Sequence, residues 1–402
     1  MDWAFETADD NWRFKFRAST PQAQLTTKRS SYLVKRVVSS PAFPFESRSV
    51  VDLRSDTVTR PTPEMYEAML NAPLGDDVLG DDPTVLELET LAAHVTGKES
   101  ALFVPSGTMG NQIALASHCN PGDAIIIEEE AHILYYEVGA PALLAGVVSW
   151  TLPSTRGAMD PDHLKRRILK PDLHTPGTTL ICLENTHNRG GGAVIPLDLM
   201  EAYRGIADLH GVKIHLDGAR VFNAAVALGV PVLDITDHVD SVNFCLSKGL
   251  RSPIGSVLCG TTEFIDKARI WRKRLGGGMR QAGILAACGL VSLTKMVDRL
   301  AEDHARAKRL AKAIHQLPGI SVDLATVETN MVLVNTAAPA TDWAAWLRQS
   351  GLLCFPVASN RLRLVFHGDI DDELTDRAIK AFCEVSEQAK DQHGALGLLG
   401  TH

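Results

Sequence analysis

Six short apolar segments between residues 101 and 247 constrain the fold of this chain most strongly. They are ALFVP (101–105), AIIIEE (124–129), VVSWTL (147–152), TLICLEN (179–185), KIHLD (213–217) and VNFCLS (242–247). Segments with helical patterns separate them. Strands that alternate with helices form a mostly parallel sheet with helices on both faces. The sequence therefore predicts a large α/β domain at residues 49–290.

The two ends of the chain depart from this pattern. A charged helical segment at 299–317 precedes strand-like runs near 322–335 and 361–367, which predicts a smaller α+β domain at residues 291–402. Residues 1–48 contain Ser, Thr, Pro and basic residues without an amphipathic period. Such a composition is typical of a disordered extension, and we expect one here.

Composition restricts the partners of the protein. The chain has 402 residues, a formal net charge of −8 and no apolar run of membrane-spanning length. An acidic protein is not attracted to nucleic acids or to anionic membranes, so we expect neither as a partner. Seven scattered cysteines without a CxxC pair indicate reduced thiols and argue against a disulfide or zinc framework. We therefore expect a cytoplasmic protein without a metal site.

A mitochondrial location is the alternative, with residues 1–48 as a presequence. Residues 13–48 are basic and contain one acid, Glu46. A presequence is poor in acids throughout, however. The first ten residues contain four acids, namely Asp2, Glu6, Asp9 and Asp10.

Two polar residues at predicted strand ends carry the strongest chemical signal. Lys248, in LSKGL, follows an apolar run, and Asp217, in HLDGAR, ends another. Desolvation disfavours the ammonium form of a lysine and leaves a free amine that can bond to an aldehyde carbon. A carboxylate can face the protonated ring nitrogen of pyridoxal phosphate. The pair predicts a site for this cofactor, although a lone lysine is more often a solvated surface residue.

A phosphate-binding turn precedes this pair in the sequence. The segment ESALFVPSGTMGNQIALASHC (99–119) predicts a strand, a turn of small residues and a helix. The turn residues are Ser106, Gly107 and Thr108. Backbone N–H groups at a helix N-terminus bind phosphate, and glycine allows a close approach. An ordinary helix cap is the alternative for this turn.

Seven motifs in one order give the chain a family resemblance. They lie between residues 52 and 367 and are DLRSDTVTRPTPEM, GDDVLGDDPTVLELE, PSGTMGNQ, HLDGARVFNA, LSKGL, RKRLGGGMRQAGILAA and RLRLV. Together they resemble the low-specificity L-threonine aldolases, which are fold-type-I pyridoxal-phosphate enzymes. The resemblance implies an aspartate-aminotransferase-like large domain and a homotetramer, a dimer of dimers with sites at subunit interfaces.

The resemblance also assigns cofactor-binding roles. It implies that Lys248 binds pyridoxal phosphate covalently and that Asp217 pairs with the ring nitrogen. Arg220 is expected near the cofactor's phenolic oxygen or the substrate carboxylate. Lys273 and Arg280, in RKRLGGGMRQ, resemble residues that reach the phosphate or a neighbouring subunit's site. The turn at 106–108 matches the family's phosphate-binding turn.

Two histidines match the family's catalytic positions. His132, in EEEAHILYYE, resembles the histidine that stacks on the cofactor ring. His187, in LENTHNRGGG, resembles the one near the substrate's β-hydroxyl, where a neutral imidazole can take a proton directly or through a water. Glu137 is a rival for the role of base.

The substrate carboxylate is expected to bind an arginine. Arg363, in RLRLVFH, matches the family's carboxylate clamp, and a guanidinium binds a carboxylate through paired hydrogen bonds. Strand alternation places Arg361 on the same face, so the pattern alone leaves the pair ambiguous. Ser55, in LRSDT, resembles a second carboxylate contact.

Three positions depart from the family pattern. Leu79 stands where the family has a tyrosine near the substrate pocket, so it puts the side-chain preference in doubt. Arg251 follows LSKGL where small residues are usual, and it could act on Lys248 or point to solvent. Phe366 replaces a threonine beside the carboxylate arginine.

The resemblance implies a retro-aldol reaction. L-Threonine, L-allo-threonine and related β-hydroxy-α-amino acids would give glycine and an aldehyde, which is acetaldehyde for threonine. A β-eliminating lyase, which would release ammonia and a keto acid, is the alternative enzyme. A non-catalytic protein that binds pyridoxal phosphate is the alternative of another class.

Overall fold

The computed structural model describes residues 7–8, 11–12 and 50–397. The chain divides into one unit at 1–45 and a second at 46–402. In the first unit, β1 (Thr7–Ala8) pairs antiparallel with β2 (Asn11–Trp12). The expected disorder of residues 1–48 otherwise falls outside the described residues. Everything below concerns the second unit.

A seven-stranded sheet forms the centre of the large domain. In spatial order its strands are β4 (Ser100–Val104), β12 (Ser256–Gly260), β11 (Ser241–Cys245), β10 (Lys213–Asp217), β9 (Thr178–Glu184), β5 (Ala124–Glu128) and β6 (Val148–Leu152). From β11 to β6 all neighbours are parallel, whereas β12 runs antiparallel to both β11 and β4. The predicted α/β fold is confirmed.

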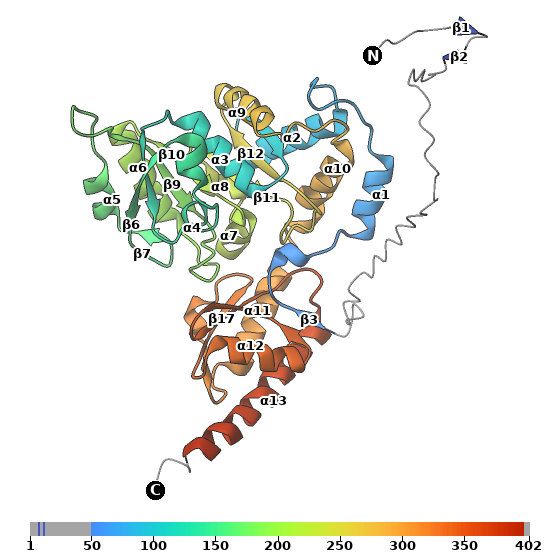
Figure 1. Ribbon diagram of the computed structural model, residues 1–402, viewed down its shortest axis with the longest axis vertical. Helices are drawn as coiled ribbons and strands as arrows, with labels where there is room; N and C mark the ends of the chain where they lie inside the picture. Colours follow the sequence, from blue (N-terminus) through green and yellow to red (C-terminus); the bar gives the residue numbers. More distant parts are fainter. Residues whose placement is uncertain (1–6, 9–10, 13–49, 398–402) are drawn as a thin grey trace, which may run out of the picture. The chain divides into compact units, whose positions relative to one another are not determined.

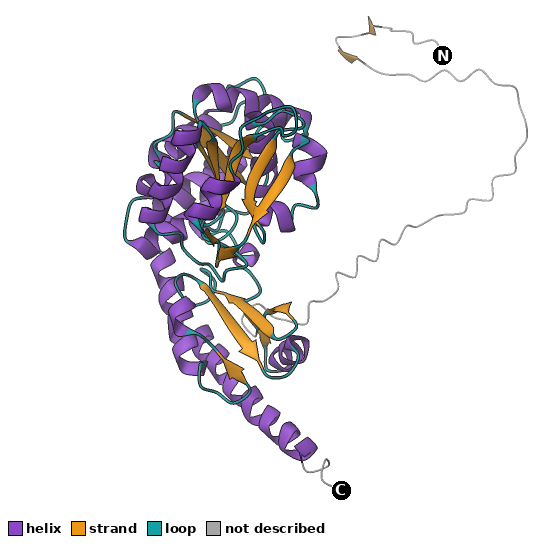
Figure 2. Cartoon of the chain, turned by 90° about the vertical axis from the view of Figure 1, so that its left-hand side faces the viewer, coloured by secondary structure: helices purple, strands orange, loops and turns teal. Residues whose placement is uncertain are grey.

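Helices cover both faces of this sheet (Figures 1 and 2). The helices of the large domain are α1 (Pro63–Asn71), α2 (Pro83–Thr96), α3 (Gly107–His118), α4 (His132–Tyr135), α5 (Pro161–Arg167), α6 (Leu197–His210), α7 (Val221–Leu228), α8 (Val232–Thr236), α9 (Thr262–Arg274) and α10 (Gly283–Val291), of which α1 packs on α10. Side chains of β5 alternate between two cores, with Ile126 in one and Ile125 and Ile127 in the other. Because both faces are buried, the strands are apolar throughout.

Local sequence signals explain where the helices begin and end. Asp82 caps α2 by accepting a hydrogen bond from Val85 N, Pro83 occupies its first turn, and Gly97 ends it with a φ of 63°. Ser106 caps α3 by accepting from Met109 N. These residues satisfy backbone groups that a helix end leaves free.

The small domain consists of a four-stranded sheet and three helices in the described part of the chain. The sheet order is β13 (Ile320–Ser321), β14 (Met331–Thr336), β17 (Arg361–Val365) and β16 (Phe355–Ala358). The helices are α11 (Leu300–Ile314), α12 (Ala340–Gln349) and α13 (Asp372–Gly397). Two small strand pairs complete the fold, β3 (Val51–Asp52) with β15 (Leu352–Leu353) and β7 (Ser154–Thr155) with β8 (Ala158–Met159).

The start of the described second unit belongs to the small domain. Val51 and Leu53 are buried in the core that also contains Trp343 and Phe382. From residue 50 onward the chain therefore starts in the small domain, crosses to the large one and returns. The division predicted at residue 49 assigns this segment to the large domain, whereas Val51 and Leu53 pack in the core of the small one.

The described helices also bear on membrane insertion. None of them combines the length and the apolar composition that crossing a bilayer requires.

Candidate active site

The ends of parallel strands bring the polar residues of the site together. Asp217 ends β10, and the register pairs it with Glu184 at the end of β9 and with Asn243 in β11. Lys248 follows the end of β11 by a few residues. Ligands of parallel α/β sheets bind beyond these carboxyl ends. Residues far apart in the sequence thus meet at one edge.

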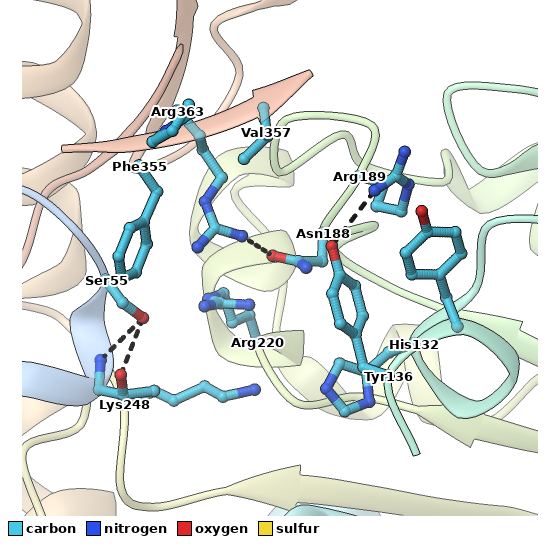
Figure 3. Close-up of a pocket in the computed structure, with 13 residues that line it drawn as sticks. Ser55, His132, Tyr136, Asn188, Arg189, Arg220, Lys248, Phe355, Val357 and Arg363 are labelled. Atoms are coloured by element: carbon cyan, nitrogen blue, oxygen red, sulfur yellow. Dashed lines mark hydrogen bonds between the residues drawn. The ribbon is translucent and has the colours of Figure 1, made fainter. Parts of the chain in front are cut away.

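A cavity of about 520 Å³ lies at this edge, between the large and the small domain (Figure 3). Its lining residues are Ser55, Thr57, His132, Tyr135, Tyr136, Asn188, Arg189, Arg220, Lys248, Phe355, Pro356, Val357 and Arg363. Five of the residues predicted for the site are among them: Ser55, His132, Arg220, Lys248 and Arg363.

Lys248 lines the cavity. Its carbonyl oxygen accepts hydrogen bonds from Thr59 Oγ1 (3.0 Å) and Arg251 N (2.9 Å), which fixes the backbone. Nζ forms no hydrogen bond or ion pair with the described residues, and Figure 3 shows the side chain extending toward His132. The amine is therefore available for a bond to a ligand.

Asp217 is held rigidly beneath the cavity. Its side chain is buried, Oδ2 accepts a hydrogen bond from Asn111 Nδ2 (2.9 Å), and Oδ1 accepts from Ala219 N (3.1 Å). Asp217 does not line the cavity. Its Oδ2 lies 3.9 Å from Nδ1 of His132, which does line the cavity.

The turn before α3 provides backbone donors. The N–H groups of Gly107 and Thr108 form no hydrogen bond with the described residues. The Ser106 hydroxyl, in contrast, already caps the helix by accepting from Met109 N. A Cβ at position 107 would lie 2.8 Å from Cys245 Sγ, so only glycine fits. The turn lies outside the cavity lining, and its free donors suit an anion.

A buried ion pair orients Arg220. Its Nε and Nη2 donate to the two carboxylate oxygens of Asp56, each at 2.7 Å. Burial opposes the charge of Asp56, but the charge and hydrogen bonds of Arg220 outweigh burial and lower the pKa of the carboxyl to about 2. Because Nη1 of Arg220 takes no part in the pair, it can bind an anion in the cavity.

Arg363 lies above Arg220 with part of its guanidinium free. Nη1 donates to Asn188 Oδ1 (2.8 Å), whereas the buried Nε has no partner in the described structure. Burial and the charge of Arg220 lower the pKa of Arg363. A carboxylate would satisfy both arginines. Arg361 instead bonds to Asn335 and does not line the main cavity.

A carboxylate also fixes the ring of His132. Nδ1 lies 3.0 Å from Glu137 Oε1, and Glu137 is itself held by Asn111 (2.9 Å) and Gln112 (2.5 Å). Burial lowers the pKa of His132, but the hydrogen bond to Glu137 and the charge of Asp217 outweigh it, so the pKa is raised. Because Glu137 is buried behind the imidazole, it has no direct access to the cavity.

His187 does not line the cavity. It is 1% exposed, Nε2 lies 2.9 Å from Glu128 Oε2, and Nδ1 accepts from Gly190 N (3.0 Å). Both ring nitrogens are therefore occupied by the protein. The expected position beside a substrate hydroxyl does not agree with this arrangement.

Sequence reasoning missed Glu184, at the end of β9. One carboxylate oxygen accepts from His132 N (2.6 Å) and the other from Asn188 N (2.8 Å). Burial raises the pKa of Glu184. This single residue ties two cavity-lining segments together, and an acid ending an apolar strand was its only signal in the sequence.

An aromatic wall was also missed. Tyr135 and Tyr136 line the cavity, and Arg189 lies over the Tyr135 ring (4.2 Å to its centroid) and donates to Tyr136 Oη (3.3 Å). The segment ILYY gave no hint of this role, since aromatic residues more often enter a core.

Leu79 and Arg251 both lie outside the cavity lining. Leu79 is 75% exposed and lies outside the cavity lining, because Asp76 holds its turn by accepting hydrogen bonds from Val78 N and Leu79 N. Arg251 contacts Lys248 through its backbone N–H only, and its guanidinium pairs with Asp369. It donates to the carbonyl oxygens of Arg60 and Gly368.

The remaining expected residues lie elsewhere in the large domain or in the small one. Lys273 and Arg280 are exposed and do not line the cavity of their own chain. Arg280 pairs with Asp76 at 3.0 Å. Phe366 is fully buried in the core of the small domain.

Among the described residues, His132, Glu137 and Asp217 have ligand atoms close enough for a metal ion, within 4.8 Å of one another. Asn111 donates hydrogen bonds to both carboxylates, however, and His132 bonds to Glu137. Amide donors that satisfy the carboxylates compete with a cation.

Comparison with known proteins identifies the family. The family model of β-eliminating lyases matches residues 52–337. Low-specificity L-threonine aldolase 1 of Arabidopsis thaliana is 48% identical over 328 residues, which cover 80% of this chain and 92% of the plant protein. Low specificity L-threonine aldolase of Escherichia coli K12 is 42% identical, covering 81% of this chain and 96% of its own.

Solved structures share the fold at low sequence identity. Threonine aldolase of Leishmania major has a TM-score of 0.73 at 18% identity, over 84% of this chain and 99% of its own. Serine palmitoyltransferase of Sphingomonas wittichii has a TM-score of 0.68 at 17% identity, over 85% and 88%. Enzymes with different activities thus share this fold. The relatives with higher sequence identity therefore identify the family of this chain more closely than the fold does. The chain belongs to the β-eliminating lyase family and, within it, to the low-specificity L-threonine aldolases.

Proposed function

We propose that this chain is an L-threonine aldolase that uses pyridoxal phosphate and cleaves L-threonine and L-allo-threonine to glycine and acetaldehyde. The observation that carries the proposal is the arrangement of Lys248, Arg363 and His132 around one cavity. An amine, an incompletely paired guanidinium and an oriented imidazole match the needs of cofactor attachment, carboxylate binding and proton transfer. The plant and bacterial relatives, which are named as L-threonine aldolases, agree with this proposal.

The residues present fit the cofactor. Lys248 would bond to the aldehyde carbon, and Asp217, whose carboxylate is held by Asn111 and Ala219, would pair with the ring nitrogen. The free N–H groups at 107 and 108 suit the phosphate, with Ser106 adjoining. When bound, pyridoxal phosphate supplies a sink for the electron pair left at Cα. His132 would stack on the ring, and Arg220 would approach its phenolic oxygen.

Arg363 binds the substrate carboxylate in this proposal. Arg363 lines the cavity beside Arg220, and a carboxylate bound there would offset the two neighbouring guanidinium charges. Ser55 lies in the same lining and offers a hydroxyl. Fixing the carboxylate and the amine together sets the torsion about the N–Cα bond and so the direction of the Cα–Cβ bond. The enzyme should therefore act on L-amino acids and reject D-threonine.

His132 is our choice for the base. Since Nδ1 faces Glu137, the neutral ring keeps a lone pair on Nε2 that can take the β-hydroxyl proton directly or through a water. The bond between Cα and Cβ then breaks, acetaldehyde leaves, and Cα gains a proton. His187 acts at a distance by supporting the 187–194 loop, and Glu137 acts through His132.

Loose discrimination at Cβ is part of this proposal. The volume of about 520 Å³ would be shared by cofactor and substrate, and the lining beside His132 includes the large side chains of Tyr135, Tyr136 and Arg189. Both epimers of L-threonine, and larger β-hydroxy-α-amino acids, should be accepted.

We also propose a homotetramer built as a dimer of dimers. Apolar side chains from α1, α2, α10 and the 74–79 loop are exposed in the single chain, namely Tyr66, Leu70, Leu74, Leu79, Leu86 and Ile284. Exposed apolar patches of this kind mark interaction surfaces. In such an assembly Lys273 and Arg280 could reach a neighbouring subunit's site.

A cytoplasmic location fits the cysteines. All seven are free thiols in the structure, and six of them are buried. Reducing compartments keep thiols in this state. The mitochondrial alternative rests on residues 1–48, and import assays of the full chain against a chain lacking them would separate the two.

Cofactor trapping tests the proposed site. Borohydride reduction followed by peptide mapping should place the pyridoxyl group on Lys248, and Lys248→Ala should lose covalent cofactor. Arg363→Lys should raise KM for L-threonine with a smaller change in kcat. A pyridoxyl group on another lysine would contradict the assignment.

A further inference from the structure

A row of buried and partly buried polar side chains extends from Asp217 away from the cavity, between α3 and the sheet. Asn111 Nδ2 donates to Asp217, and Asn111 Oδ1 lies 3.3 Å from His215 Nε2. His215 Nδ1 lies 2.9 Å from Ser241 Oγ, which lies 2.8 Å from His118 Nε2. We call these four residues, Asn111, His215, Ser241 and His118, the donor chain.

The direction of every hydrogen bond in the donor chain can be deduced. The amide of Asn111 faces two carboxylates, Asp217 and Glu137, which accept only, so its nitrogen points to them. Its oxygen consequently faces Asn243 Nδ2 (2.9 Å), which also donates to Gly107 O (2.9 Å). An oxygen in this place can only accept.

The orientation of the amide fixes the proton on the next ring. Because Asn111 Oδ1 accepts, His215 Nε2 must carry a hydrogen. His215 is fully buried, and burial lowers its pKa to about 3, so the ring is neutral and Nδ1 has no hydrogen. Ser241 must therefore donate to Nδ1 and accept from His118 Nε2. All four donors point toward Asp217.

We infer that the donor chain keeps the Asp217 carboxylate ionised and so keeps the proton on the cofactor's ring nitrogen. A proton shared between a carboxylate and a ring nitrogen lies on the nitrogen when the carboxylate is stabilised as an anion. Each donor polarises the next, which strengthens the bond that reaches Asp217. His215, Ser241 and His118 are positioning residues, since none touches the cavity. This inference rests on the proposed role of Asp217.

Nitrogen-15 NMR of the cofactor-free protein tests the direction of the chain. At neutral pH, His215 should show a protonated Nε2 and an unprotonated Nδ1, and His118 should carry its hydrogen on Nε2. The opposite ring form of His215, or a doubly protonated ring, would overturn the inference whatever the cofactor does.

The holoenzyme tests the effect on the cofactor. With pyridoxal phosphate labelled at the ring nitrogen, Ser241→Ala and His215→Phe should both move the nitrogen resonance toward the unprotonated position. We expect kcat to fall by roughly 5-fold for Ser241→Ala, the effect of one lost hydrogen bond. Ser292→Ala is the matched control, because Ser292 is equally buried and bonds to Ser252 and Leu250 O, away from this network.

Two outcomes separate this inference from the proposed function. If His215→Phe does not fold, the near-isosteric Ser241→Ala decides alone. An unchanged resonance in folded Ser241→Ala, beside a shifted one in Asp217→Asn, would refute the donor chain and leave the role of Asp217 intact. An unchanged resonance in Asp217→Asn would refute both.

Discussion

At the scale of the residue, buried carboxylates hold the charged and basic groups of the cavity in place. Asp56 binds Arg220 through two hydrogen bonds, Glu137 orients His132, and Glu184 accepts from the backbone at 132 and 188. Each carboxylate lies behind the lining. Substitutions behind the lining should therefore alter groups that contact the substrate.

Asp56→Asn should destabilise the protein by about 3–5 kcal/mol, because Arg220 would remain buried with an uncompensated charge. In the wild type, the pKa of Asp56 is lower in the folded than in the unfolded chain. Asp56 therefore contributes to the free energy of unfolding above its unfolded pKa of about 4. This contribution is lost as the pH falls toward its folded pKa of about 2. Urea unfolding between neutral and acidic pH measures both effects. Glu263→Gln, which changes an exposed ion pair with Lys267, is the control and should unfold as the wild type does.

Glu137→Gln should shift the acidic limb of the kcat/KM profile to lower pH. The hydrogen bond to Glu137 raises the pKa of His132, so its loss lets the ring become neutral at lower pH. Rates on L-threonine across the pH range measure the shift. Glu129→Gln removes an exposed carboxylate from the same segment and should not move the limb. A limb that stays in place in Glu137→Gln would show that another group is the base.

At the scale of the element, close packing of α3 on β11 sets the position of the phosphate turn. A Cβ at Gly110, on α3, would lie 2.2 Å from Asn243 Oδ1, on β11. Asn243 also donates to Gly107 O at the start of the helix. Helix, strand and turn are therefore fixed together.

Gly110→Ala should destabilise the protein by about 1–3 kcal/mol, because the methyl group forces α3 away from the sheet. Gly205→Ala, also inside a helix, meets no atom within 4 Å and should stabilise by about 0.5–1 kcal/mol. Thermal and urea unfolding of both variants compare the two. If both substitutions changed the free energy of unfolding equally, helix propensity and not packing would determine the effect at position 110.

The elements also show what the sequence could predict. The six apolar segments named first are all strands, because a buried parallel strand is apolar along its whole length. The segment SVLCG at 256–260 was missed as β12, since it follows a loop directly and no helix separates it from β11. Lys248, Arg363 and His132 were found through motifs. Glu184, Tyr135 and Tyr136 were not, because only the folded chain shows which face of a segment meets the cavity.

At the scale of the whole molecule, the cavity depends on residues from both domains. Arg363 and Phe355 come from the small-domain sheet, whereas Lys248 and His132 come from the large domain. Asn188 connects them by accepting from Arg363. The relative position of the two domains therefore sets the size of the site.

Leu70→Asp should weaken the proposed tetramer, because it places a charge among the exposed apolar side chains of α1, α2, α10 and the 74–79 loop. Leu70 is 86% exposed in the single chain. Leu173, which is 93% exposed in a loop after α5, provides the control Leu173→Asp. Sedimentation velocity should show smaller species for the first variant only. An unchanged distribution for Leu70→Asp would place the subunit contact elsewhere.

The most direct test of the central claim is a product balance on L-threonine. The holoenzyme should form acetaldehyde and glycine in equal amounts and release no ammonia. L-allo-Threonine should give the same products, D-threonine should give none, and Lys248→Ala should be inactive on all three. Ammonia with a keto acid would instead identify a β-eliminating lyase, and no product from cofactor-loaded protein would identify a binding protein. Either result would contradict the assignment as a threonine aldolase.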